Sequence, residues 1–344
     1  MMETNSKIKT ILGHEHHQVK METNSFVLPW NMLPKEISDR SSLQQLYLID
    51  CIPLEIFSLS PSLKRLFICN CRTLEFSQPK ERMNLLEDLY LGRSCDSLQT
   101  FPLNYFPKLK SLSMWDCRNL ECLSVDKELQ NELTSLDAME IKYCPKLRSF
   151  LEEDEFRAPN LTSLVFFDCG SLKSLQRIQT FESLQSLYII KCPALDSIPM
   201  EALPSGLIIL CISYCDKVTP HKGWKLDKLH SVVHFEIEGE CRKLESFPEE
   251  GLLPRNLNSL RISGLLNLTS LDMEGLQKLT SLQTLEISSC DKLNSLPEHK
   301  FPSSLSSLSI TDCSLLNPKL RNRRGKEWLK IAHIPSISLD EDSE

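Results

Sequence analysis

Several absences narrow the classes to which this 344-residue chain can belong. No apolar run approaches the roughly 20 residues that cross a bilayer, and the N-terminus lacks the basic segment and apolar run of a secretory signal. Basic residues are not in excess, because the net charge is −7 with a pI near 5.7. A broad nucleic-acid or acidic-membrane footprint is therefore not predicted. We expect a soluble, cytoplasmic protein.

The chain also lacks any shift in composition that would divide it into two domains. It is nevertheless too long for one ordinary compact core. Hydrophobic residues make up 41% and charged residues 25%, which are near globular averages, so most of the chain should fold. A chain of this length and uniform composition can fold if it repeats one small structural unit.

The stretch "LEISSCDKLNSLP" at residues 285–297 shows what this unit is. Written as LxxLxLxxC followed by xxLxxL, it recurs twelve times between Leu43 and Leu305, a distance of 262 residues or about 24 per repeat. That period lies within the range of about 20 to 29 residues that is typical of leucine-rich repeats. The first position of the unit is Leu43, Leu63, Leu86, Leu109, Leu136, Leu161, Leu184, Leu207, Val232, Leu257, Leu282 and Leu305.

The repeat predicts an α/β-type solenoid, a leucine-rich-repeat horseshoe with one concave parallel β-sheet and a mostly irregular convex side. The LxL core alternates with period two, so each unit contributes a short strand whose leucines point inward. Twelve strands at about 4.8 Å give a sheet about 55 Å long. Helix-length amphipathic segments are missing from most connections, and prolines precede many first leucines. They stand two residues before it (Pro61, Pro107, Pro159) or three residues before it (Pro204, Pro254, Pro302).

We expect three segments along the chain: a disordered leader at residues 1–26, the solenoid at 27–320, and a C-terminal cap with an acidic tail at 321–344. Arrays of repeats need terminal units that cover their last apolar face. In "WLKIAHIPSISL" the four residues that could cover the twelfth repeat are Trp328, Ile331, Ile334 and Ile337.

The fourteen cysteines follow the repeat and do not indicate a disulfide scaffold, which is typical of short secreted domains. A small side chain with a weak S–H donor suits the turn where the chain leaves the sheet. We expect these thiols to be buried, free and mostly unreactive. The turn position holds Cys51, Cys71, Cys95, Cys117, Cys144, Cys169, Cys192, Cys215, Cys241, Cys290 and Cys313, with Leu265 in the tenth repeat.

The run "LTSLQTLEISSCDKLNSLPEHKFPSSLSSLSITDCSLL" at 279–316, followed by "WLKIAHIPSISLDED" at 328–342, resembles a known family. It is similar to the leucine-rich-repeat region of plant coiled-coil, nucleotide-binding, leucine-rich-repeat (NLR) disease-resistance proteins. The resemblance covers roughly residues 27–344. It implies recognition of pathogen effectors and restraint of an adjoining nucleotide switch.

The chain departs from that family in one respect, because it contains no G-x-x-x-x-G-K-[ST] loop to cradle phosphates. Its nearest Gly-Lys pair, Gly325-Lys326, is followed by Glu327. Since the chain reaches its repeats by about residue 43, we expect a truncated relative or an isolated recognition module that binds no nucleotide.

No catalytic or cofactor constellation is predicted, because the repeat does not bring a serine, a histidine and an acid together. His14, His16 and His17 have no cysteine or carboxylate partner at a recognised metal spacing, so they are interpreted as part of a solvated tail. Cys69 and Cys211 should face the open side of the sheet while Cys71 and Cys215 face the core, which excludes a zinc site at either pair.

Aromatic residues concentrate at outward strand positions of the first seven repeats, whereas repeats nine to twelve carry mainly glutamate and serine there. Strand propensity alone would favour aromatics in every repeat alike. Exposed contiguous aromatics are enriched at binding hot spots. The candidate protein-binding residues are Tyr47, Phe67, Tyr90, Trp115, Phe167 and Tyr188.

The sequence thus predicts a non-enzymatic recognition module of plant defence, which binds a pathogen effector, a host protein or an NLR signalling domain through its concave face. The alternative is a substrate adaptor of a ubiquitin ligase, but residues 1–42 are short and polar for the helical segment that it would require. The ectodomain of a receptor kinase would need a signal peptide, glycine-rich repeats and a membrane span. The chain has ten glycines and neither of the other features.

Overall fold

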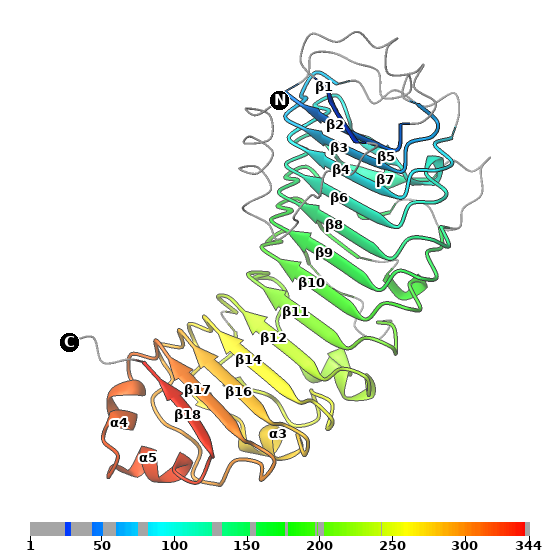
Figure 1. The fold of residues 1–344 in the computed structure, drawn as a ribbon. Coiled ribbons are helices and arrows are strands. Elements are labelled where there is room, and N and C mark those ends of the chain that lie inside the picture. Colours follow the sequence, from blue (N-terminus) through cyan, green and yellow to red (C-terminus); the bar gives the residue numbers. More distant parts are fainter. Residues whose placement is uncertain are drawn as a thin grey trace.

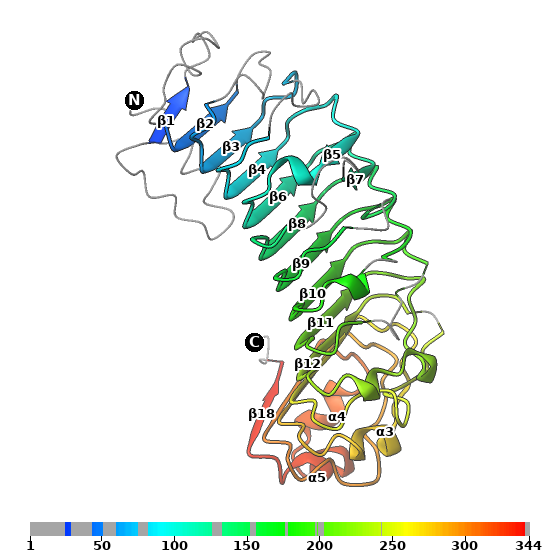
Figure 2. The same cartoon turned by 90° about the vertical axis from the view of Figure 1, so that its right-hand side faces the viewer.

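The computed structural model describes residues 25–28, 43–50, 60–74, 82–125, 133–151, 156–175, 178–196, 198, 203–241 and 243–340. Among these residues fourteen parallel strands form one continuous sheet. The sheet lines the inner side of a curved stack, with β1 and β18 at its two ends (Figures 1 and 2). The predicted leucine-rich-repeat horseshoe is confirmed.

Twelve of the strands coincide with the twelve predicted repeats. They are β2 (Gln45–Ile49), β3 (Arg65–Cys69), β4 (Asp88–Gly92), β6 (Ser111–Trp115), β8 (Ala138–Lys142), β9 (Ser163–Phe167), β10 (Ser186–Ile190), β11 (Ile209–Ser213), β12 (His234–Glu238), β14 (Ser259–Ser263), β16 (Thr284–Ser288) and β17 (Ser307–Thr311). The other two, β1 (Ser25–Leu28) and β18 (Ser336–Leu339), extend the sheet beyond the predicted repeats.

The alternation of apolar and polar residues explains which face each strand buries. In β16, Leu285 and Ile287 are fully buried, whereas Thr284, Glu286 and Ser288 are half-buried on the inner face of the arc. The strands pair without a shift in register, so each inward residue stacks on its equivalent in the next repeat. One apolar column therefore continues through the stack, and no repeat buries its leucines alone.

The prolines that precede many strands lie in the turn through which the chain enters the sheet. The N–H group of the first leucine donates to the carbonyl of the residue three positions earlier, for example Leu63 to Ser60 at 3.2 Å and Leu305 to Pro302 at 3.0 Å. Proline two residues before the leucine occupies the second position of this turn, which its fixed φ favours. Proline three residues before occupies the first position, where only its carbonyl is used.

The cysteine begins a second turn, where the chain leaves the sheet. In the eighth repeat the Cys215 carbonyl accepts from the N–H of Val218 at 2.8 Å. Its thiol lies 3.6 Å from the Ile189 carbonyl of the preceding repeat and 3.4 Å from the Ser213 carbonyl. The thiol thus joins two successive repeats through weak hydrogen bonds. All thirteen cysteines among the described residues are buried and free; Cys51 lies outside them, as do His14, His16 and His17.

In the part of the chain that the structure describes, the convex side carries only short regular elements, as predicted. The strand pairs β5 (Thr100–Pro102) with β7 (Cys122–Ser124) and β13 (Ser246–Phe247) with β15 (Ser270–Leu271) each link two neighbouring repeats. Short helical turns complete the described connections: η2 (Leu103–Tyr105), η3 (Ile178–Thr180), η5 (Lys222–Trp224), η6 (Leu226–Lys228) and α3 (Met273–Gln277).

The last repeat is followed by α4 (Asn317–Arg321), α5 (Lys326–Ile331) and β18, which pairs with β17. Ile331 and Ile334 are buried in the core, and Trp328 and Ile337 pack against it while partly exposed. The segment after residue 320 therefore contributes a strand as well as apolar side chains to the end of the stack. None of the helices that the structure describes is both long and apolar enough to cross a bilayer.

Candidate protein-binding face

The inner face of the sheet presents the first, third and fifth residue of every strand. The six candidate residues all occupy such positions, but their accessibility differs. Tyr47 and Phe67 are only 5% and 9% exposed, and they form a separate apolar cluster with Ile49 and Cys69. Tyr90 packs against this cluster, with its ring stacked 4.3 Å from that of Phe67. A residue at an inner-face position of a strand is therefore not always accessible to a partner.

A glycine makes room for the Tyr90 ring. A Cβ atom at Gly92 would lie 2.7 Å from the ring of Tyr90, so a side chain at this position would displace the tyrosine. Gly92 occupies the fifth position of β4, where β6 and β9 carry Trp115 and Phe167. The absence of a side chain at Gly92 leaves the space that the Tyr90 ring occupies.

Trp115, Phe167 and Tyr188 are half-buried on the inner face. Trp115 and Phe167 lie at the carboxyl ends of β6 and β9, which are separated by β8 (Figure 1). Tyr188 lies at the centre of β10, between Val165 of β9 and Cys211 of β11. Burial against these neighbours raises the pKa of its phenol.

Tyr143, which the sequence analysis did not single out, joins Trp115 to Phe167. Its ring lies 6.0 Å from that of Trp115, edge to face, and 5.1 Å from that of Phe167. With 39% exposure it is more accessible than any of the six candidates. The sequence contains a signal for it, because Tyr143 and Tyr214 each directly precede a turn cysteine.

The position before the turn cysteine has a special backbone conformation that directs these side chains. Tyr143 has φ +55° and Tyr214 has φ +52°, in the left-handed region. The N–H group of Tyr143 donates to the Phe167 carbonyl in the next repeat at 2.7 Å, and that of Tyr214 donates to the Glu238 carbonyl at 2.7 Å. This bond to the next strand holds each aromatic side chain at the carboxyl edge of the sheet.

Two cations extend the row of rings. The Arg93 guanidinium lies 4.4 Å from the centre of the Trp115 ring. The Lys191 ammonium lies 5.6 Å from the centre of the Phe167 ring and 6.0 Å from that of Tyr214. Such cation–π contacts stabilise by about 0.5–1 kcal/mol at exposed sites. We call this row the aromatic–cationic ridge; its members are Arg93, Trp115, Tyr143, Phe167, Lys191 and Tyr214.

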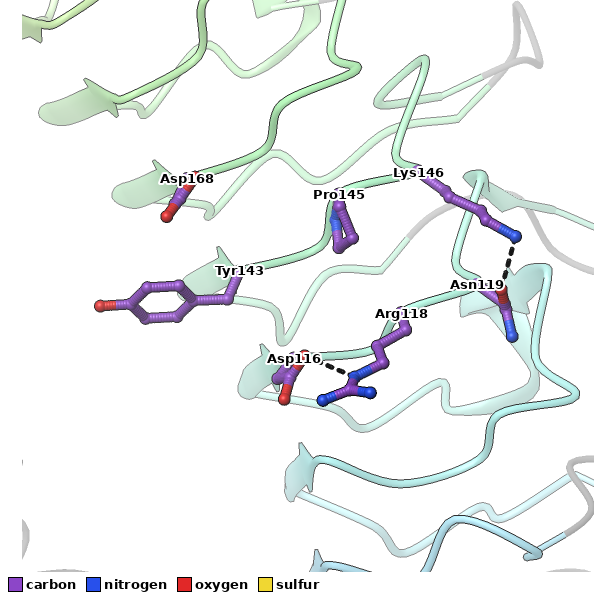
Figure 3. A pocket seen from close by; sticks show the side chains of 7 residues that line it. All are labelled: Asp116, Arg118, Asn119, Tyr143, Pro145, Lys146 and Asp168. Atoms are coloured by element: carbon purple, nitrogen blue, oxygen red, sulfur yellow. Dashed lines mark hydrogen bonds and ion pairs between the residues drawn. The ribbon is translucent and has the colours of Figure 1, made fainter.

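A hollow of about 450 Å³ lies beside the ridge (Figure 3). Tyr143 extends outward at its edge, and the lining residues come from three successive turns. Arg118 donates to Asp116 at 3.3 Å, and the Lys146 ammonium donates to the Asn119 amide oxygen at 2.7 Å. The lining residues are Asp116, Arg118, Asn119, Tyr143, Pro145, Lys146 and Asp168.

The other half of the inner face is polar and paired with itself. Arg261 on β14 lies 3.8 Å from Glu236 and 3.9 Å from Glu286. A hydrogen bond with His234, together with the charge of Arg261, lowers the pKa of Glu236. The Ser263 hydroxyl donates to Glu238 at 3.2 Å. The contrast between an aromatic half and a polar half, expected from the sequence, is thus present in the spatial arrangement of the sheet.

The described residues contain no cluster of metal-ligating side chains. No group of three or more histidine, cysteine, aspartate or glutamate side chains converges among them. Burial raises the pKa of Cys69 to about 11 and that of Cys211 to about 12, so these two thiols of the inner face stay protonated at neutral pH. What the face offers is rings, cations and hydrogen-bonding groups over an extended surface.

The sequence is similar to curated plant proteins. A disease-resistance protein of Arabidopsis thaliana is 39% identical over 316 residues, which cover 90% of this chain. The chain is similar over most of its length to a plant disease-resistance protein. The Arabidopsis protein SUPPRESSOR OF npr1-1, CONSTITUTIVE 1 is 28% identical over 62% of this chain, and the disease-resistance RPP13-like protein 1 is 29% identical over 46%. No family model matches the sequence.

The chain spans only part of these relatives: 22%, 14% and 13% of their respective lengths. Among solved structures, an internalin of Listeria monocytogenes (InlF) is 18% identical with a TM-score of 0.43, covering 98% of this chain and 95% of its own. The leucine-rich-repeat domain of the type III effector XopL is 20% identical with a TM-score of 0.39, covering 67% and 77%.

Proposed function

We propose that this chain is a non-enzymatic recognition module of plant disease resistance, which binds another protein through the concave face of its sheet. The partner is a pathogen effector, a host protein or a signalling domain of a resistance receptor. The module itself contributes no nucleotide switch, because its sequence has no phosphate-cradling loop. It acts in the cytoplasm, where its buried thiols stay reduced.

One observation carries this proposal, namely the row of rings that crosses the sheet from Trp115 to Tyr214. Side chains on the inner face can vary without disturbing the core, because the apolar column lies on the other side of the strands. Aromatic and arginine side chains dominate the energetics of protein interfaces. Here they lie together on a face that the repeat leaves open, whereas the glutamates of the other half pair with Arg261.

Site-specific photocrosslinking tests the proposal. A photoreactive phenylalanine analogue is introduced at Phe167 on the concave face, at Ser309 in the polar half, or at the exposed Leu85. Each variant is expressed in plant tissue, and crosslinked proteins are identified by mass spectrometry. We expect a specific adduct from Phe167. A yield at Phe167 no higher than at Leu85 would overturn the proposal.

The crosslinked protein is then purified and titrated against the unmodified chain. Specific binding with a dissociation constant in the micromolar range or below supports a recognition role. If the adduct does not bind in this titration, the crosslink reports a chance encounter and the proposed function fails.

A further inference from the structure

We propose that the aromatic–cationic ridge and the adjoining hollow bind an extended acidic segment of a partner polypeptide. This inference rests on the proposed recognition function and names the chemistry of its partner. The ridge is continuous, because each of its members contacts the next through a ring–ring or cation–π contact. A ligand that follows the carboxyl edge of the sheet therefore meets one uninterrupted surface.

The ridge is accessible and retains unused donors. Tyr143 and Tyr214 are 39% and 43% exposed. Lys191 contacts the two rings but has no carboxylate partner among the described residues, and Lys146 donates to the neutral Asn119 side chain. Each ammonium group has three donors, so both lysines can still donate to an incoming carboxylate.

Charge favours an acidic ligand at this place although the whole chain has a net charge of −7. The ridge and the hollow together carry four cations and two carboxylates: Arg93, Arg118, Lys146, Lys191, Asp116 and Asp168. Asp116 already lies 3.6 Å from Arg93 and 3.3 Å from Arg118. Opposite charges across an interface steer encounter and fix orientation.

The arrangement also indicates an extended ligand. Arg93 follows β4 and Tyr214 follows β11, which are five strand positions apart in the sheet. At about 4.8 Å per strand the ridge spans about 24 Å, the length of roughly seven extended residues. In an extended segment, successive side chains point to opposite sides. If acidic and apolar residues alternate, the acidic residues can therefore turn together toward the cations while the apolar residues turn toward the rings.

A polypeptide fits the ridge better than a single-stranded nucleic acid, which also uses rings and cations. A nucleic-acid backbone places a negative charge at every nucleotide. Asp168 stands exposed in the hollow, and Glu238 accepts the hydroxyl of Tyr214 at the far end of the ridge, 3.0 Å away. These carboxylates oppose a continuous polyanion but leave room for a segment whose acidic residues are spaced.

Fluorescence anisotropy with the full chain tests this inference. The probe is a fluorescein-labelled nine-residue peptide that alternates aspartate with leucine or tyrosine, and its match carries asparagine in place of every aspartate. We expect the acidic probe to bind at least about tenfold tighter than the neutral one at low salt, and less tightly as salt is added.

Matched lysine variants localise the effect. The double variant Lys146→Gln, Lys191→Gln removes the two ammonium groups and keeps every ring. The control is Lys292→Gln, whose lysine makes the same contact with an asparagine, Asn267, in a later repeat at 2.6 Å. We expect the double variant to lose about tenfold in affinity for the acidic probe and the control to bind like the wild type, with both melting normally.

Three results would overturn the inference: equal binding of the acidic and neutral probes, equal losses in the double variant and the control, or absence of binding by either probe. Tighter binding of a fluorescein-labelled single-stranded oligonucleotide that displaces the acidic peptide would overturn it in favour of nucleic acid. If photocrosslinking at Phe167 still yields a partner that binds the purified chain, such results remove the acidic-segment inference alone and leave the proposed function standing.

Discussion

The turn cysteine Cys95 should react with alkylating reagents about a thousandfold more slowly in the native protein than after unfolding. Cys95 is almost completely buried, and burial raises the pKa of its thiol from 9.0 to about 12. Since only the thiolate reacts, the reactive fraction at pH 8 falls from about one in ten to about one in ten thousand. For Cys241, whose pKa burial raises to about 11, the corresponding factor is about a hundred.

Iodoacetamide labelling followed by peptide mass spectrometry measures each site separately. We expect slow labelling of Cys95 and Cys241 in native protein and complete labelling of both in urea. A native rate within about tenfold of the unfolded rate would refute the reasoning, because it would require exposed thiolates at these turns. Isolation of several disulfides from freshly prepared protein would contradict the description of the thiols as free.

Three further outcomes follow from the packing. Leu285→Ala should lower the free energy of unfolding in urea by about 2–5 kcal/mol, because it leaves a cavity in the apolar column, whereas Glu286→Ala on the open face should cost less than about 1 kcal/mol. Gly239→Ala should lower the free energy of unfolding by about 1–3 kcal/mol, because φ is +121° and a Cβ would lie 3.0 Å from the backbone of Tyr214. Gly170→Ala should leave it nearly unchanged in the same titration, because a Cβ at Gly170 would meet no atom within 4 Å. Deletion of residues 326–344 should lower the melting temperature, since it uncovers the last repeat, and an unchanged melt would contradict a capping role.

The fold could be predicted from the sequence because the same pattern of buried leucines occurs in twelve successive repeats. A single LxL triplet is compatible with many structures, but leucines at a fixed period must stack. Leu285, for example, pairs in register with Leu260 and Leu308. The strands β1 and β18 could not be found in this way, because they lie outside the repeat and follow from pairing with a neighbour.

The candidate site could be predicted only in part, because a register position fixes the side of the sheet and not the surroundings. Tyr47 occupies an outward position and is nevertheless buried in a local cluster. Tyr143 falls between the strand and the turn cysteine, where a search of alternating positions does not look. Its left-handed backbone and its bond to the next repeat, which direct the side chain, depend on tertiary structure.

The affinity of alanine variants for the partner identified by photocrosslinking tests the central claim most directly. Trp115→Ala and Tyr188→Ala should each weaken binding by roughly 2 kcal/mol, about thirtyfold, while the protein melts as the wild type does. Ser288→Ala and Ser309→Ala, on the polar half of the same face, should change binding little. Equal losses from both pairs of substitutions, or unfolding of Trp115→Ala, would contradict the account and place the site elsewhere.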